Sequence, residues 1–113
     1  MTEKRFEGLV RNVIEEINNR VKNKGQEYAR VDRLSNFKVA ASMSKRRGET
    51  PEQALMGMLK KHWVSILDIT DDTAEDKIAD YTVWYEKCLD NIVYSICLLG
   101  LVMDREDSSD RPS

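Results

Sequence analysis

The chain has 113 residues, of which 41% are hydrophobic and 34% charged, and its formal net charge is −2. This length predicts a single domain over residues 1–103, and the Asp- and Ser-rich composition of residues 104–113 predicts a disordered acidic tail. The N-terminus has no apolar signal-peptide core, and the apolar run over residues 92–103 is too short to span a bilayer. We therefore expect a cytoplasmic protein that does not contact membranes.

The two halves of the sequence differ in charge. Residues 1–63 carry 14 Lys and Arg against 8 Asp and Glu, whereas residues 64–113 carry 4 against 12. This split indicates either a face that attracts anions or two parts of the fold that attract each other. The acidic second half and a pI near 5.5 disfavour nucleic acid as a partner. A Gly-rich phosphate loop, a Cys-x-x-Cys pair and a His-Glu-x-x-His motif are absent from the sequence, so nothing indicates a nucleophilic hydrolase or a structural zinc site.

The first predicted element is an amphipathic helix over residues 3–23. Its apolar residues recur at spacings of three and four, which places them on one helix face. They are Phe6, Leu9, Val10, Val13, Ile14, Ile17 and Val21. Lys24 and Gly25 are expected to end this helix, and residues 26–34 then form a polar connection.

Two further helices follow, and the local sequence marks their ends. Ser35 is a suitable N-cap for a helix over residues 36–46, and Gly48 suits the position just past its end. The next predicted helix covers residues 51–69. Its start is marked by a capping-box pair and a proline in the first turn: Thr50, Gln53 and Pro51.

The last predicted helix covers residues 82–103 and is apolar on nearly every side in its second half. The sequence has no alternating strand pattern and no internal repeat. We therefore predict an all-α, four-helix bundle-like fold. Part of the last helix could serve as a dimer face, so we expect a homo-oligomer.

Glu86, Asp90 and Tyr94 stand four residues apart in the last helix and so share one face. A carboxylate inside a helical bundle needs a cation, a hydrogen-bond donor or a ligand. We interpret Glu86 and Asp90, with Glu27 as a further acid, as candidate ligands of Mg²⁺. Water molecules and substrate phosphates would complete the coordination shell of the ion. The alternative is structural, with Glu86 at the solvent edge and Asp90 paired with Lys87 or with a lysine of the preceding helix.

The single histidine, His62, lies on the apolar face of the predicted helix 51–69, directly after Lys60 and Lys61. It is a candidate hydrogen-bond donor to a phosphate, or a candidate general base. Lys61 would add attraction for a phosphate. The alternative is a core histidine whose hydrogen bonds are satisfied within the fold. The candidate ligand-binding residues are Tyr28, Asn36, Lys61, His62 and Tyr94.

Four short motifs follow one another within residues 20–103. They are Lys24-Gly25-Gln26-Glu27-Tyr28, Ser35-Asn36-Phe37, Thr50-Pro51-Glu52-Gln53 and Asp90-Asn91-Ile92-Val93-Tyr94. Their order resembles a family of small all-α proteins of bacteriophages and prophages. That family is distantly similar to the MazG-like all-α nucleoside triphosphate pyrophosphohydrolases, which are oligomeric and Mg²⁺-dependent. This chain carries Lys60, Lys61 and Lys87 where those enzymes have acids.

The resemblance implies a phage-type protein of the host cytoplasm that binds a nucleotide or a related phosphorylated metabolite. Residual Mg²⁺-dependent pyrophosphohydrolase activity stays open in this interpretation. A second hypothesis is a non-enzymatic interaction protein that inhibits or modulates a host protein, such as a defence component. A third is a self-associating bundle without a ligand.

Overall fold

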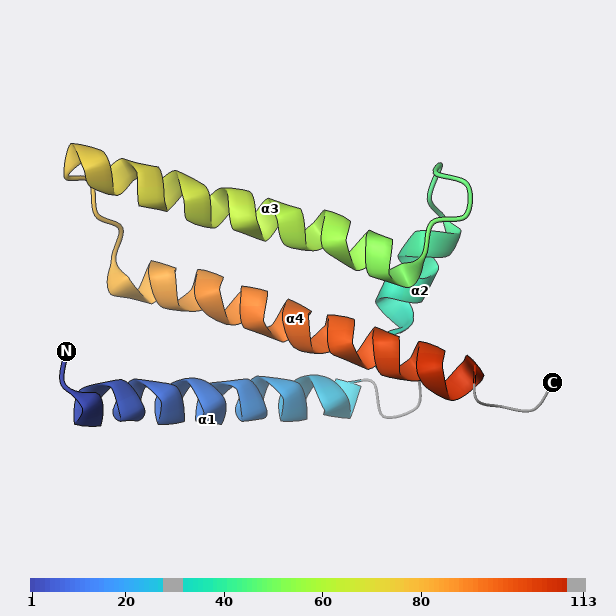
Figure 1. Cartoon of the computed structure of the whole chain (residues 1–113), viewed down its shortest axis with the longest axis horizontal. Helices are drawn as coiled ribbons and strands as arrows, with labels where there is room; N and C mark the ends of the chain where they lie inside the picture. The colour runs from blue at the N-terminus through green and yellow to red at the C-terminus, as the bar shows by residue number, and fades with distance from the viewer. Residues whose placement is uncertain (28–31, 110–113) are drawn as a thin grey trace. The chain divides into compact units, whose positions relative to one another are not determined.

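A computed structural model describes the backbone of residues 1–27 and 32–109 and the side chains of residues 1–23 and 32–107. It contains four α-helices and one 3₁₀ turn: α1 (Glu3–Glu27), α2 (Ser35–Ser42), α3 (Pro51–Asp72), η1 (Thr73–Glu75) and α4 (Tyr81–Ser109) (Figure 1). These residues include no strand, so the all-α prediction is confirmed. Within the same residues, no helix has an apolar stretch long enough to cross a membrane.

The chain separates into two compact units, Met1–Arg33 and Leu34–Ser113, which are described separately. The first unit is built on α1, whose apolar side chains form the predicted stripe. The helix does not end at Lys24 and Gly25 as predicted but continues to Glu27. A glycine within a helix costs only about 1 kcal/mol relative to alanine, so it lowers helix stability without forcing an end.

The second unit begins with α2, and both predicted ends of this helix are wrong. The N-cap is Leu34 rather than Ser35, and no side chain caps the helix start. The helix ends at Ser42, four residues before the predicted end, because serine hydroxyls there engage the backbone. Ser42 Oγ donates to the Val39 carbonyl at 2.7 Å, and Ser44 Oγ accepts from the Arg46 amide at 3.0 Å.

The start of α3 is confirmed. Thr50 Oγ1 accepts a hydrogen bond from the Gln53 amide at 3.2 Å, and Gln53 Oε1 accepts one from the Thr50 amide at 3.0 Å. This reciprocal pair is a capping box with Pro51 in the first turn. The helix extends to Asp72 rather than residue 69, so part of the predicted loop is helical. Asp76, with φ of 58°, ends the η1 turn that follows.

The last helix also extends beyond its prediction, from Tyr81 to Ser109 instead of 82–103. Two ion pairs hold its final turns to the rest of the unit. Lys38 Nζ lies 3.2 Å from Asp104 Oδ2, and Arg105 pairs with Glu52. The predicted disordered tail is therefore helical as far as Ser109, and its last four residues lie outside the described part of the chain.

The core of the second unit lies where α2 crosses the paired helices. In Figure 1, α3 and α4 run side by side in opposite directions, and α2 lies at the N-terminal end of α3. The core cluster consists of Leu34, Phe37, Leu55, Leu59 and Leu101, with Met58, Tyr94, Cys97 and Leu98 packed against it. Gly100 allows the close approach of Leu34, because a Cβ added at this glycine would lie 3.1 Å from Leu34 Cδ1.

Candidate functional site

Three of the predicted site residues meet where the middle of α3 faces the middle of α4. His62 Nδ1 lies 3.9 Å from Asp90 Oδ2, and the His62 ring lies 4.9 Å from the Tyr94 ring between centroids. The side chains of His62 and Asp90 are 33% and 44% exposed. This His62 cluster, defined as His62, Asp90 and Tyr94, is therefore partly shielded by the helices but open to a ligand from solvent.

The core of the unit supports the cluster from behind. Tyr94 packs edge-on against Phe37 of α2, with ring centroids 6.1 Å apart and an interplanar angle of 64°. Such edge-to-face contact is a favoured aromatic geometry. Phe37 is itself buried in the core cluster. The position of the His62 imidazole is thus linked through Tyr94 to the packing of α2.

A second polar contact between α3 and α4 lies one helical turn away. Lys87 Nζ donates to Ser65 Oγ in a partly buried position. Asn91, which is 7% exposed, donates from Nδ2 to the Lys87 carbonyl at 3.2 Å. Its Oδ1 has no hydrogen-bond partner among the described residues. The contact of Lys87 with Ser65 joins the two helices in the same register as the pair of His62 and Asp90, whereas the Asn91 bond lies within α4.

Sequence reasoning missed Ser65 and Phe37 as supports of the cluster, and it considered Lys87 as a partner of Asp90 and as a departure from the acids of MazG-like enzymes, not as a partner of Ser65. A signal for two of them exists in the sequence. Ser65 lies three residues after His62, and Lys87 lies three residues before Asp90, so each shares a helix face with a cluster residue. The contact of Phe37 depends on the fold and has no local signal.

The other predicted site residues do not belong to the His62 cluster. Lys61 and Glu86 are exposed, each on the same helix as a cluster member, and Asn36 is exposed in the first turn of α2. Glu27 is the last residue of α1, and only its backbone is described. Tyr28 lies outside the described residues.

Within the described side chains, no three His, Cys, Asp or Glu residues gather to hold a metal ion. Glu86 and Asp90 follow each other by one helical turn, and the nearby Lys87 amine is directed to Ser65. Mg²⁺ can bind through one or two carboxylates when substrate phosphates supply the remaining ligands. The described residues therefore form no self-sufficient metal centre, and the Mg²⁺ prediction depends on a phosphorylated ligand.

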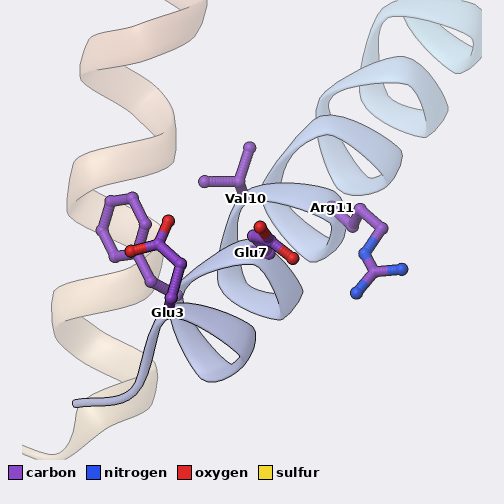
Figure 2. A pocket seen from close by; sticks show the side chains of 5 residues that line it. Glu3, Glu7, Val10 and Arg11 are labelled. Atoms are coloured by element: carbon purple, nitrogen blue, oxygen red, sulfur yellow. The ribbon is translucent and has the colours of Figure 1, made fainter.

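The first unit has a shallow hollow of its own on α1. Figure 2 shows Glu3, Glu7, Val10 and Arg11 along the first turns of this helix, and Phe6 completes the lining. All five residues come from one helix face, at spacings of three and four. Among the described side chains no second element lines it, so the hollow provides a mixed apolar and charged surface rather than converging groups.

Comparison of the chain with models of protein families, with curated protein sequences and with solved structures finds no match. The resemblance to phage proteins and to MazG-like enzymes thus stays a prediction from the quoted motifs.

Proposed function

We propose that this protein binds a nucleotide or a related phosphorylated metabolite at the His62 cluster. The observation that carries the proposal is the approach of His62 to both Asp90 and Tyr94, from a neighbouring helix and at a partly exposed position. Nδ1 of His62 lies 3.9 Å from Asp90 Oδ2, and the Tyr94 ring lies beside the imidazole at 4.9 Å between centroids. With Nδ1 turned toward Asp90, Nε2 is the ring nitrogen that a ligand phosphate would meet.

The charges around the cluster indicate which chemical class of ligand would bind there. Lys61 is adjacent to His62 and supplies a cation for a phosphate oxygen. Asp90 disfavours a purely anionic ligand close to its carboxylate, so the phosphate would lie on the α3 side of the cluster. The Asp90 side would receive hydrogen-bond donors, such as the hydroxyl groups of a ribose or the amino group of a base. A phosphorylated nucleoside combines these two features.

Mg²⁺ enters this proposal only with the ligand. With Mg²⁺ bound, the cation would offset the repulsion between Asp90 and a phosphate, and Glu86 and Asp90 would instead share it with the ligand phosphates, because no three acids gather among the described residues. We therefore propose binding as the primary activity and assign no catalytic residue. The wider expectations, namely a phage origin and a place in the host cytoplasm, are part of the same proposal.

Isothermal titration of the full chain with inorganic phosphate and with nucleoside mono-, di- and triphosphates, each with and without Mg²⁺, tests the proposal. We expect heat with at least one nucleotide. His62→Gln and Lys61→Gln should each weaken binding about tenfold or more, since a hydrogen bond to a charged group contributes about 1.5–3 kcal/mol.

Lys60→Gln is the matched control. Lys60 is exposed and carries the same charge as Lys61, but it lies two residues before His62 and so about 200° around the helix. Its replacement should leave the affinity unchanged. An absence of heat with every nucleotide would end the proposal. Equal weakening by Lys60→Gln and Lys61→Gln would also contradict it, because the attraction would then be non-specific.

A second candidate function is binding to another protein. Trp63, Val64 and Leu67 lie on α3 on the side away from His62 and are 50%, 55% and 56% exposed. An exposed tryptophan with apolar neighbours is typical of a protein-binding surface. If this function holds, Trp63→Ala should abolish co-purification of a stoichiometric host protein, whereas Asp90→Ala should not. Loss with Asp90→Ala and retention with Trp63→Ala would refute it.

For either candidate function we also propose how the helices and the copies of the chain are arranged. We propose that the four helices form one bundle and that copies of the chain assemble. Support comes from the small core, since only eight hydrophobic residues of the described part of the chain are buried while many large apolar side chains there are exposed. Apolar surface on this scale favours association.

A further inference from the structure

The face of α4 that points away from α3 carries a continuous apolar stripe. Its members are separated by four, three, four, four, three and four residues, a spacing that keeps them on one side of a helix. They are Tyr81, Tyr85, Cys88, Ile92, Ile96, Leu99 and Met103, called here the outer stripe. The rings of Tyr81 and Tyr85 pack against each other at 5.9 Å between centroids, which places them together on this face.

The outer stripe lies opposite the contact with α3. Asp90 and Tyr94 face His62 of α3, and Ile92 lies two residues from each, about 200° around the helix. Its side chains are accessible: Tyr81 and Leu99 are 65% exposed, and Met103 is 63% exposed. No member of the stripe is charged. A surface of this kind along a long helix is typical of a helix–helix interface.

The spacing of the stripe is symmetric about Ile92. Tyr81 and Met103 lie 11 residues on either side of it, Tyr85 and Leu99 seven, and Cys88 and Ile96 four. Two antiparallel copies of such a stripe match each other position by position. We propose that α4 pairs with α4 of a second copy of this chain, antiparallel, with the two-fold axis at Ile92. The proposal is independent of any ligand at the His62 cluster.

The size of the stripe is sufficient for such a pair. It extends over 22 residues, or about 33 Å of helix. If a second copy covered the exposed area of these side chains completely, the pair would bury roughly 600 Å² on each copy. That total, about 1,200 Å², is at the lower end of stable specific interfaces. The two tyrosines would supply large contact areas at each end, as aromatic residues do in many interfaces.

The pairing also fits the charges of the helix. Between Tyr81 and Met103, α4 has three charged residues, Glu86, Lys87 and Asp90. Lys87 and Asp90 contact α3, so neither needs to be desolvated between two copies of α4. Glu86 lies six residues from Ile92, about 120° around the helix, so none of the three charges lies on the outer stripe.

Cross-linking of the full chain with a short bis-maleimide tests the orientation. In a background with Cys88→Ser and Cys97→Ala, the double variant Tyr85→Cys/Leu99→Cys should form covalent dimers, because the two positions face each other across the axis. Tyr85→Cys alone should not cross-link, since its two copies would be about 21 Å apart along the helices. Ile92→Cys should cross-link to itself.

Light scattering of the untreated protein provides the second measurement. We expect about twice the 13.1 kDa chain mass and a monomer for Leu99→Glu. Val39→Glu is the control, because Val39 is a 53% exposed apolar residue of α2 outside the stripe, and this variant should stay dimeric. Circular dichroism checks that each variant folds. A monomeric parent, a dimer unaffected by Leu99→Glu, or cross-linking of Tyr85→Cys alone would each overturn the proposal, the last by indicating a parallel pair.

Discussion

Gly100 is the position at which the packing of the second unit can be tested most sharply. Replacing a helix-interior glycine by alanine normally stabilises a protein by about 1 kcal/mol, because alanine restricts the unfolded chain and favours the helix. At Gly100 the new Cβ would lie 3.1 Å from Leu34 Cδ1. This contact is a few tenths of an ångström too short, so Leu34 must move and loses part of its packing.

We expect the two effects at Gly100 to cancel, so that Gly100→Ala changes the free energy of unfolding by about zero. Gly57→Ala is the matched control. Gly57 lies within α3, and a Cβ there would meet no atom within 4 Å, so the full gain of about 1 kcal/mol is expected. Urea unfolding followed by circular dichroism at 222 nm measures both values by linear extrapolation.

A double-mutant cycle identifies the cause. In a Leu34→Ala background the short contact is gone, and Gly100→Ala should then stabilise as much as Gly57→Ala does. If Gly100→Ala already stabilises the parent protein by about 1 kcal/mol, the packing of Leu34 against α4 is wrong. If its effect stays near zero in the Leu34→Ala background, the contact with Leu34 is not the reason.

Three further predictions concern the same unit. Thr50→Ala should lower the free energy of unfolding by about 1 kcal/mol through loss of the capping box, and an unchanged urea midpoint would contradict the cap. Leu55→Ala should lower the free energy of unfolding by about 3 kcal/mol because Leu55 is fully buried. Met56→Ala, at a neighbour that is 38% exposed, should lower it by less than about 1 kcal/mol. Equal losses for the two variants would refute the burial of Leu55. A double-mutant cycle on the exposed pair Lys38 and Asp104 should give a coupling below about 1 kcal/mol that weakens in salt, and a larger, salt-independent value would contradict the exposed geometry.

The range of the interactions involved accounts for two of the outcomes at predicted helix ends, the start of α3 and the end of α4. The start of α3 was predicted correctly because Thr50 and Gln53 satisfy each other's backbone groups within four residues. The end of α4 was missed because it depends on Arg105 reaching Glu52, a residue 53 positions away. Contacts of that separation leave no periodic or local pattern in the sequence.

The contacts of the His62 cluster could be predicted from the sequence in part. Its contacts pair residue 62 with 90 and residue 65 with 87, and both pairs are centred on residue 76. Asp76, in the left-handed conformation, ends the η1 turn and lies within the connection between the two helices. The midpoint between the centres of the predicted helices 51–69 and 82–103 lies within one residue of this point, so the sequence already places the middle of one helix opposite the middle of the other.

What the sequence could not supply is the rotation of the two helices about their axes. A shift of one residue along a helix turns its face by about 100°, so an uncertainty of one residue in the turn is enough to exchange Asp90 for Leu89 or Asn91 opposite His62. Predicted helix ends carry at least that uncertainty. The contact between Lys87 and Ser65 removes it, because a second pair in the same register permits only one rotation. The site therefore follows from the length of the turn together with one polar contact, and neither is sufficient alone.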